Sequence, residues 1–329
     1  MKAQPMIVLL TGAGGDAQGW GNMHVTEAVR DAVADNGYAC RIVLAENRSE
    51  LETRLKEGPC DLVWSALYFF SDREDIIGIP PDAVWVADVL DELKIPYIGP
   101  SAQTMKNLIG KFDTHEILAA HGVRVPRHVL CPPAPASAVD FFPAFVKPNG
   151  ESRSVGISEK SVAETPEALA SQVEFIRREL GQAALVEEYL PGREYTVMVI
   201  GNGAHREILP GRVTVPPEHY GKYPILRSDL RGVGLTKVSL PQEHREDAAE
   251  LAAAACDALG CDDHVRIDMR EGTDGKLRIM EVNGIPGLKP GKSWSPQIYA
   301  LYHPEDKDPY RGLIGTVVNC ALERAYGKR

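Results

Sequence analysis

The chain has 329 residues, of which 44% are hydrophobic and 25% are charged, as expected for a globular protein of two or three domains. Its formal net charge of -10 at pH 7 argues against nucleic acid or a membrane surface as a partner, because both are polyanions. Six scattered cysteines form no C-x-x-C pair, and no apolar stretch reaches the length of a membrane span or a signal-peptide core. We therefore expect reduced thiols and a cytoplasmic location.

The first hundred residues alternate short apolar runs with helical patterns. Met6–Leu10 is a continuous apolar run that ends at glycines, as buried parallel strands do. Further strands are expected at Ala39–Leu44, Asp61–Leu67 and Pro96–Gly99, and helices at His24–Asn36, Glu50–Glu57 and Pro81–Leu93. This alternation predicts a doubly wound parallel sheet.

The rhythm changes after residue 100. We expect a helix at Ser101–His121 and then a proline-rich surface segment, Arg127–Ala138. Hairpin-like strands are expected at Ala144–Pro148, Ser154–Ser158, Ala184–Tyr189 and Glu194–Gly201, and helices at Pro166–Leu180, Glu243–Leu259 and Tyr310–Tyr326. Asn202-Gly203 predicts a tight hairpin turn, whereas Pro210–Pro241 has only weak periodicity and is expected to be a functional loop or disordered.

The segment Val265–Asn283 contains two strand-like runs around an Asp-Gly turn signal. If that dipeptide is the turn, Asp268 lies opposite Glu281 and Arg266 opposite Asn283, and all four side chains share one face. Two carboxylates at cross-strand distance repel each other, and a magnesium ion between them removes the penalty while the Asn oxygen adds a third ligand. Arg266 would then stabilise charge on nearby phosphates. The alternative is a solvent-facing hairpin; the glycine-rich continuation after Asn283 favours the metal site.

Two other segments indicate nucleotide binding. Lys147 ends an apolar strand and precedes a glycine- and serine-rich loop whose amides can donate to phosphate oxygens. The strand that reaches Tyr189 ends in acidic residues, and an extended segment of this kind can read adenine through its backbone, with Glu194 accepting from ribose hydroxyls. A flexible loop with a solvated lysine, and an ordinary acidic strand end, are the alternatives.

Together these motifs resemble the ATP-grasp superfamily and, within it, the D-alanine–D-alanine ligase family. The resemblance is carried, in chain order, by Val146–Pro148, Ser154–Ser158, Glu187–Val197, Arg266–Asp268 and Glu281–Gly287. It implies an α/β ATP-grasp fold in which an N-terminal doubly wound parallel sheet is followed by two α+β subdomains that clamp ATP. The implied domains are a substrate-binding domain at 1–100, a central subdomain at 101–185, and a C-terminal subdomain with the magnesium site and a closing loop at 186–329.

The resemblance also implies a role for each matching residue. Lys111 and Lys147 would hold the ATP phosphates, Glu187, Glu188, Tyr189 and Leu190 the adenine, and Glu194 the ribose. Magnesium, or manganese, would be bound by Asp268, Glu281 and Asn283. Arg266, Ser154, and Lys222 with Tyr223 of the closing loop would be catalytic, while Gly287 and Ser293 would contact the second substrate. The implied reaction joins a carboxylate to an amine through an acyl phosphate, releasing ADP and phosphate, in a protein that is expected to be a homodimer.

The departures from the family lie where it recognises its amino acids. Its glutamate after the first strand and its His-Gly after the third have no match in Gly14–His24 and Leu67–Asp72. A family serine position is Arg153, and the segment after Gly287 contains Lys289 and Lys292, which with Arg153 are candidates to hold an extra carboxylate; solvated surface charges are the alternative. We therefore expect a specialised amino-acid or natural-product ligase. The competing functions are a cell-wall D-alanine–D-alanine ligase, an ATP-binding or phosphotransferase module that makes no amide, and an oxidoreductase, which the glycine spacing disfavours.

Overall fold

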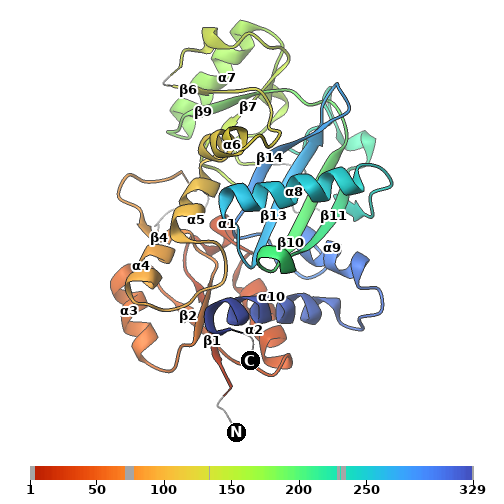
Figure 1. The fold of residues 1–329 in the computed structure, drawn as a ribbon. Coiled ribbons are helices and arrows are strands. Elements are labelled where there is room, and N and C mark those ends of the chain that lie inside the picture. Colours follow the sequence, from red (N-terminus) through yellow and green to blue (C-terminus); the bar gives the residue numbers. More distant parts are fainter. Residues whose placement is uncertain (1–3, 71–77, 133, 228–229, 231–234, 328–329) are drawn as a thin grey trace.

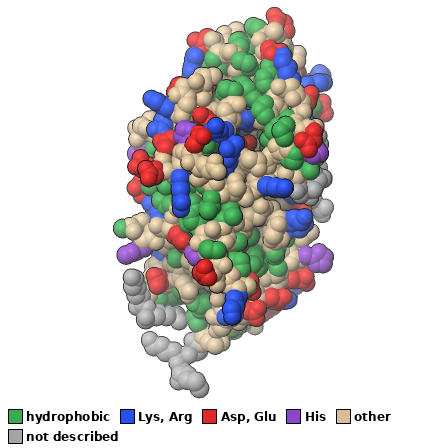
Figure 2. Space-filling view, turned by 90° about the vertical axis from the view of Figure 1, so that its right-hand side faces the viewer, with side chains coloured by type: hydrophobic (Ala, Val, Ile, Leu, Met, Phe, Trp, Pro, Cys, Tyr) green, Lys and Arg blue, Asp and Glu red, His purple; other side chains and the backbone are tan. Residues whose placement is uncertain are grey.

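The computed structural model describes residues 4–70, 78–132, 134–227, 230 and 235–327. The expected departure at Leu67–Asp72 therefore lies partly outside the described residues, at Ser71 and Asp72. Three main β-sheets follow one another along the chain, with helices packed on them (Figure 1). On the face shown in Figure 2, acidic and basic side chains are interspersed rather than gathered by sign. In the described ranges, every helix is too short or too polar to serve as a membrane span.

The N-terminal sheet is parallel, with strand order β2-β1-β3. Its strands are β1 (Met6–Thr11), β2 (Ala39–Leu44) and β3 (Leu62–Ser65), and Val63 also bridges Tyr97 in parallel. Ile7 and Leu9 of β1 pack with α2 (Met23–Asp35) and α10 (Pro309–Tyr326). Val8 and Leu10 face the other way, toward α3 (Arg48–Lys56) and α4 (Val86–Glu92). The predicted doubly wound sheet is thus confirmed, because alternate side chains of one strand enter two separate cores.

Short elements connect these layers. They are α1 (Gly15–Gln18), the two-stranded ribbon of β4 (Phe69–Phe70) and β5 (Val84–Trp85), and the 3-10 turns η1 (Ala136–Ala138), η2 (Glu159–Ser161), η3 (Gly203–His205) and η4 (Pro217–His219).

The predicted helix Ser101–His121 is wrong as a single element. It is divided at Gly110 into α5 (Ala102–Ile109) and α6 (Lys111–Ala120). Gly110 has φ -83° and ψ 97°, outside helical geometry, and the Lys111 N–H donates to Asn149 O at 3.1 Å. The break therefore makes Lys111 the first residue of a new helix, docked against the loop that follows Lys147.

The central sheet is antiparallel, with order β6-β9-β7-β8, and α7 (Pro166–Glu179) covers it. Its strands are β6 (His128–Cys131), β7 (Ala144–Pro148), β8 (Val162–Ala163) and β9 (Ala184–Glu188). Two predictions fail here. The segment expected to run along the surface supplies β6, and Ser154–Ser158 forms tight turns rather than a strand. Arg153 and Ser154 have φ of 56° and 59°, a left-handed conformation that no strand contains.

The C-terminal sheet is antiparallel, with order β12-β11-β10-β13-β14. Its strands are β10 (Glu194–Ile200), β11 (Glu207–Thr214), β12 (Lys237–Ser239), β13 (His264–Glu271) and β14 (Leu277–Asn283), and α8 (Arg245–Leu259) and α9 (Trp294–Tyr302) cover opposite faces. The weakly periodic region thus contains most of β11 and all of β12. The prediction of a tight hairpin turn at Asn202-Gly203 is wrong, because the longer segment 201–206 connects β10 to β11. Helix α9 was not anticipated.

Side-chain packing extends across the predicted domain boundaries at residues 100 and 185. These boundaries stay a prediction. Leu108 of α5 and Leu118 of α6 pack in the core of the C-terminal sheet, and α10 returns to α2 beside the N-terminal sheet (Figure 1). The fully buried Asp263 ties these parts together: it accepts from Gly99 N at 2.9 Å and from Arg324 Nη2 at 2.6 Å.

Candidate active site

Two adjoining cavities lie where the three sheets meet. The first is bounded by the central and C-terminal sheets, and the second by the N-terminal and C-terminal parts, with a volume of about 330 Å³. Both are lined by Lys111, Glu151, Ser152, Leu226, Glu281 and Trp294. A ligand in one cavity can therefore meet a ligand in the other next to Lys111 and Glu281.

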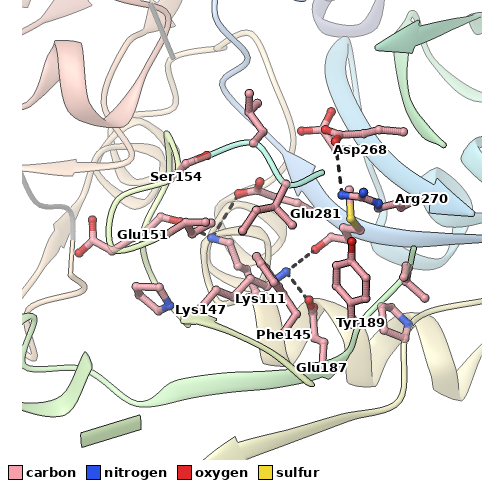
Figure 3. Close-up of a pocket in the computed structure, with 18 of the residues that line it drawn as sticks. Lys111, Phe145, Lys147, Glu151, Ser154, Glu187, Tyr189, Asp268, Arg270 and Glu281 are labelled. Carbon is pink, nitrogen blue, oxygen red and sulfur yellow. Dashed lines mark hydrogen bonds and ion pairs between the residues drawn. The ribbon is translucent and has the colours of Figure 1, made fainter. Parts of the chain in front are cut away.

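A buried charge cluster forms the floor of the first cavity. Lys147 Nζ lies 2.8 Å from Glu187 Oε1 (Figure 3). His115 Nε2 lies 2.6 Å from the same oxygen. Antiparallel pairing puts Phe145 opposite Glu187, so Lys147 two residues on faces the same side of the sheet. Burial would raise the pKa of Glu187, but Lys147 and His115 outweigh it and lower that pKa to about 2. Burial lowers the pKa of His115 against the opposing pull of Glu187, which favours the neutral imidazole. The cluster therefore fixes the Lys147 side chain at the floor of the first cavity.

Lys111 is the second lysine that lines the first cavity. Its Nζ lies 3.2 Å from Glu281 Oε1 and donates to the backbone oxygen of Glu151 (Figure 3). Lys147 also donates to the backbone oxygen of Met280, at 3.0 Å. The two lysines predicted to hold phosphates are thus brought together, although they come from a helix start and a strand end in different parts of the chain.

The hairpin β13–β14 has the predicted pairing at its functional end: Asp268 lies opposite Glu281, and Arg266 opposite Asn283. Arg266 donates from Nε and Nη2 to both carboxylate oxygens of Asp268, at 2.9 and 2.7 Å. Asn283 Nδ2 lies 3.2 Å from Asp268 Oδ2, and Thr196 Oγ1 donates to Asp268 Oδ1 at 2.7 Å. Burial opposes the charge on Arg266, but Asp268 outweighs it and raises the pKa of the guanidinium, which stays charged.

These side chains fit a hard divalent cation. Across the described residues, no three His, Cys, Asp or Glu side chains come together as a metal-binding group. The hairpin offers two carboxylates and one amide on a single face. Such a set suits magnesium when substrate phosphates and water complete its octahedral shell.

The far end of the first cavity is more apolar. Phe145, Val155, Ile157, Met280 and Ile225 line it with the predicted residues Glu188, Tyr189 and Leu190. Glu194 lies at one edge, where its Oε2 is 3.8 Å from Arg270 Nη1. Arg270 donates to the backbone oxygens of Gly192 and Pro224, so it fixes the chain on both sides of this edge. A flat aromatic group would find apolar walls here, with a carboxylate at the rim.

The second cavity contains the four predicted substrate residues Arg153, Gly287, Lys292 and Ser293, and also Lys289. A Cβ added to Gly287 would lie 2.8 Å from Ser293 Oγ, so only glycine lets these two segments approach so closely. Arg153 Nη1 lies 3.2 Å from Asp16 Oδ2 and donates to the Asp16 backbone oxygen at 2.7 Å. Arg153, which stands at a family serine position, is therefore paired with a carboxylate of the segment Gly14–His24.

Lys222 and Tyr223 lie in neither cavity lining. Lys222 Nζ is 2.6 Å from Glu164 Oε1, and the Tyr223 hydroxyl donates to the same carboxylate; Lys222 and Glu164 are both largely exposed. Hydrogen bonding to Glu164 raises the pKa of Lys222. Ser154, in contrast, is buried and lines the first cavity. Of the four predicted catalytic residues, the structure brings Arg266 and Ser154 to the cavities and leaves the other two at the surface.

Sequence reasoning missed several residues of the site. His115, Thr196 and Arg270 hold predicted residues in place. Each lay inside an expected helix or strand; Thr196 falls within the motif Glu187–Val197, but nothing there distinguished it as a partner of Asp268. Tyr68 lines the second cavity, and its hydroxyl accepts from the Gly284 and Ile285 backbone N–H groups, both at 3.0 Å. Burial is the main cause that raises the pKa of Tyr68 to about 12.

Comparison with known proteins agrees with this geometry. The family model "D-ala D-ala ligase C-terminus" matches residues 134–300. A D-alanine–D-alanine ligase from Halalkalibacterium halodurans is 30% identical over 248 residues, 73% of this chain and 77% of its own, and one from Haemophilus ducreyi is 28% identical over 81% and 84%. The crystal structure of the Bacillus anthracis D-alanine–D-alanine ligase complexed with ATP superimposes with a TM-score of 0.70 over 98% of both chains, at 20% identity. The chain therefore has the ATP-grasp fold, belongs to the D-alanine–D-alanine ligase family, and is an ATP-dependent carbon–nitrogen ligase.

Proposed function

We propose that the protein activates the carboxylate of one amino-acid-like substrate with ATP and joins it to the amine of a second. The observation that carries the proposal is the junction of the two cavities at Lys111 and Glu281. ATP would occupy the first cavity and the two substrates the second, so the γ-phosphate would meet the carboxylate at that junction.

In the first step, a carboxylate oxygen attacks the γ-phosphorus, and the bond to the β-phosphate oxygen breaks to release ADP. Lys111 and Lys147 balance the phosphate charge as it shifts, and both are pre-positioned by buried acceptors, so little reorganisation accompanies transfer. Asp268, Glu281 and Asn283 would hold Mg²⁺, or Mn²⁺, which would supply positive charge to offset that of the ATP phosphates.

In the second step, a neutral amine attacks the acyl phosphate. The tetrahedral intermediate expels phosphate, the amine loses a proton, and an amide remains. The Arg266 guanidinium, held flat against Asp268 and 5.0 Å from the Trp294 ring centre, would stabilise the oxyanion. Gly287 and Ser293 would position the amine substrate. Lys222 and Tyr223, on a closing loop, and Ser154 would act by excluding water from the acyl phosphate.

Because the relatives are D-alanine–D-alanine ligases, that activity is the second candidate for this chain. We favour other substrates, as in a specialised or natural-product ligase, because Asp16 is paired with Arg153 and the mouth of the second cavity is basic. A homodimer and a cytoplasmic location remain part of the proposal; the six free cysteines are compatible with a reducing compartment.

The test is an ADP-release assay over all pairs of D- and L-amino acids, with the amide product identified by mass spectrometry. ADP release that requires both a carboxylate and an amine supports ligation, whereas release without amide would indicate a phosphotransferase. Efficient turnover with D-alanine alone would reject the specialised ligase in favour of the second candidate.

A matched pair of hairpin variants tests the metal site. Asp268→Asn is expected to lower kcat by about 100-fold or more, because a metal ligand and the partner of Arg266 are lost together. Asp274→Asn, in the exposed turn of the same hairpin, is the control and should keep its activity. Equal activity of the two variants would contradict the assigned role of Asp268.

A further inference from the structure

A short turn at the mouth of the second cavity presents two lysines. We call residues 288–293 the lysine turn. The Lys289 N–H donates to Ser293 Oγ at 3.0 Å, and the Lys292 and Ser293 N–H groups donate to the Lys289 oxygen at 3.2 and 3.0 Å. The Leu288 N–H donates to Trp20 O at 3.1 Å, which ties the turn to another residue of the cavity lining. The backbone of both lysines is therefore fixed, although both residues are exposed.

The second cavity carries excess positive charge in an acidic protein. Its lining has five basic residues, Lys111, Arg153, Arg266, Lys289 and Lys292, against three acidic residues, Asp16, Glu151 and Glu281. The chain as a whole has a net charge of -10. A local charge of the opposite sign raises the concentration of a complementary ligand in the cavity, because low-dielectric walls focus the field.

The excess charge is located at the lysine turn. Lys111 pairs with Glu281, Arg266 with Asp268, and Arg153 with Asp16. Within the described part of the chain, neither Lys289 nor Lys292 makes an ion pair. The reacting groups already have their cations at Lys111 and Arg266, so the lysine turn is available to a group that does not react.

We propose that one of the two substrates is an acidic amino acid, or a compound of the same charge pattern, whose extra carboxylate binds Lys289 and Lys292. This inference rests on the proposed function and specifies the substrate class of that site. Both lysines line the same cavity and neither has an ion-pair partner among the described residues, so an extra carboxylate on a substrate in that cavity would supply the missing charge.

The test compares acids with their isosteric amides. Binding of aspartate, asparagine, glutamate and glutamine, in both enantiomers, is measured by calorimetry on the full chain with Mg²⁺ and a non-hydrolysable ATP analogue. At least one acid is expected to bind about tenfold more tightly than its amide, and the ratio should shrink as salt is raised. Lys289→Gln combined with Lys292→Gln should abolish the ratio. Lys276→Gln combined with Lys307→Gln, at two exposed lysines outside the cavities, should leave it unchanged.

Equal binding of acid and amide, a ratio that survives in the Lys289→Gln and Lys292→Gln double variant, or no binding of any of the four amino acids would each overturn the inference. The proposed function is judged separately by ADP release and amide formation. Selective binding of the acid without any amide formation would reject the ligase proposal but support the anion site. Amide formation without a preference for the acid would support the ligase proposal but reject the anion site.

Discussion

Replacing Glu187 tests whether charge holds Lys147 in place at the floor of the first cavity. Its carboxylate is buried, with only 3% of its surface exposed, and accepts from both Lys147 and His115. Glu187→Gln keeps the shape but removes the charge, so Lys147 becomes a buried cation without a carboxylate. The pKa of Glu187 lies at about 2, below its ordinary 4.5. At roughly 1.4 kcal/mol per unit, that difference corresponds to about 3 kcal/mol of stability. Breaking a buried pair by removing one partner costs a similar amount, about 3–5 kcal/mol.

Thermal unfolding at pH 7 measures the effect, and the variant should melt roughly 5 °C below the unmodified protein. Glu174→Gln, which breaks the exposed pair with Arg177 on α7, is the matched control and should melt with the unmodified protein. Adding Lys147→Met to Glu187→Gln removes both charges and should recover part of the loss. A Glu187→Gln protein as stable as the control would refute the argument that Lys147 is held by charge.

The pH dependence has a definite sign. Because the folded state depresses the pKa of Glu187, its contribution is fully present above pH 4.5 and is lost as the pH falls toward 2. The stability difference between the unmodified protein and Glu187→Gln should therefore narrow below pH 4.5. A difference that stays constant from pH 7 to pH 3 would assign the loss to packing rather than to charge.

Two further variants test the proposed closing loop and the buried contacts of Asp263. Lys222→Ala should leave the melting temperature unchanged, because the ion pair of Lys222 with Glu164 is exposed. It should lower kcat at least about tenfold. An unchanged kcat would show that Lys222 has no role in the reaction. Asp263→Ala leaves the Arg324 guanidinium without its carboxylate and the Gly99 N–H without its acceptor, and should lower the free energy of unfolding by about 3 kcal/mol in a urea titration. The exposed Asp35→Ala variant is its control, and similar midpoints for the two would contradict the assigned tie.

The hairpin register shows both the strength of the sequence argument and where it ends. The predicted two-residue turn is wrong, since Glu271 pairs with Leu277 and five residues form the loop. That change alone would shift the register by one residue and turn Glu281 to the other face. A β-bulge at Met280 restores it, so Asp268 still meets Glu281. The bulge also frees the Met280 oxygen to accept from Lys147. The hydrophobic periodicity located both strands. Nothing in a single sequence, however, predicts that a longer loop and a β-bulge will cancel each other's effect on the register.

Other parts of the site were beyond sequence reasoning for similar reasons. Gly110 did not predict the end of a helix within Ser101–His121, because a single glycine is tolerated in helices. The helix is interrupted there because the Lys111 N–H donates to the Asn149 oxygen instead. The positions of Lys222 and Tyr223 depend on Glu164, 58 residues away from Lys222, and so on tertiary contacts rather than on local pattern. Most of the residues predicted from the motifs therefore line the two cavities, while the partners that hold them had to be seen in the structure.

The return of α10 to α2 has a consequence for synthesis on the ribosome. Residues 309–326 are made long after residues 6–65, yet Leu313, Val317 and Ala321 fill the same core as Ile7, Leu9 and Val29. Until α10 emerges, that side of the first sheet remains uncovered, and its apolar surface can bind other nascent chains. The N-terminal sheet is thus translated before the other two sheets, but its core is completed only when α10 has been made. A nascent chain stalled before residue 309 should be captured by chaperones more readily than one that includes α10.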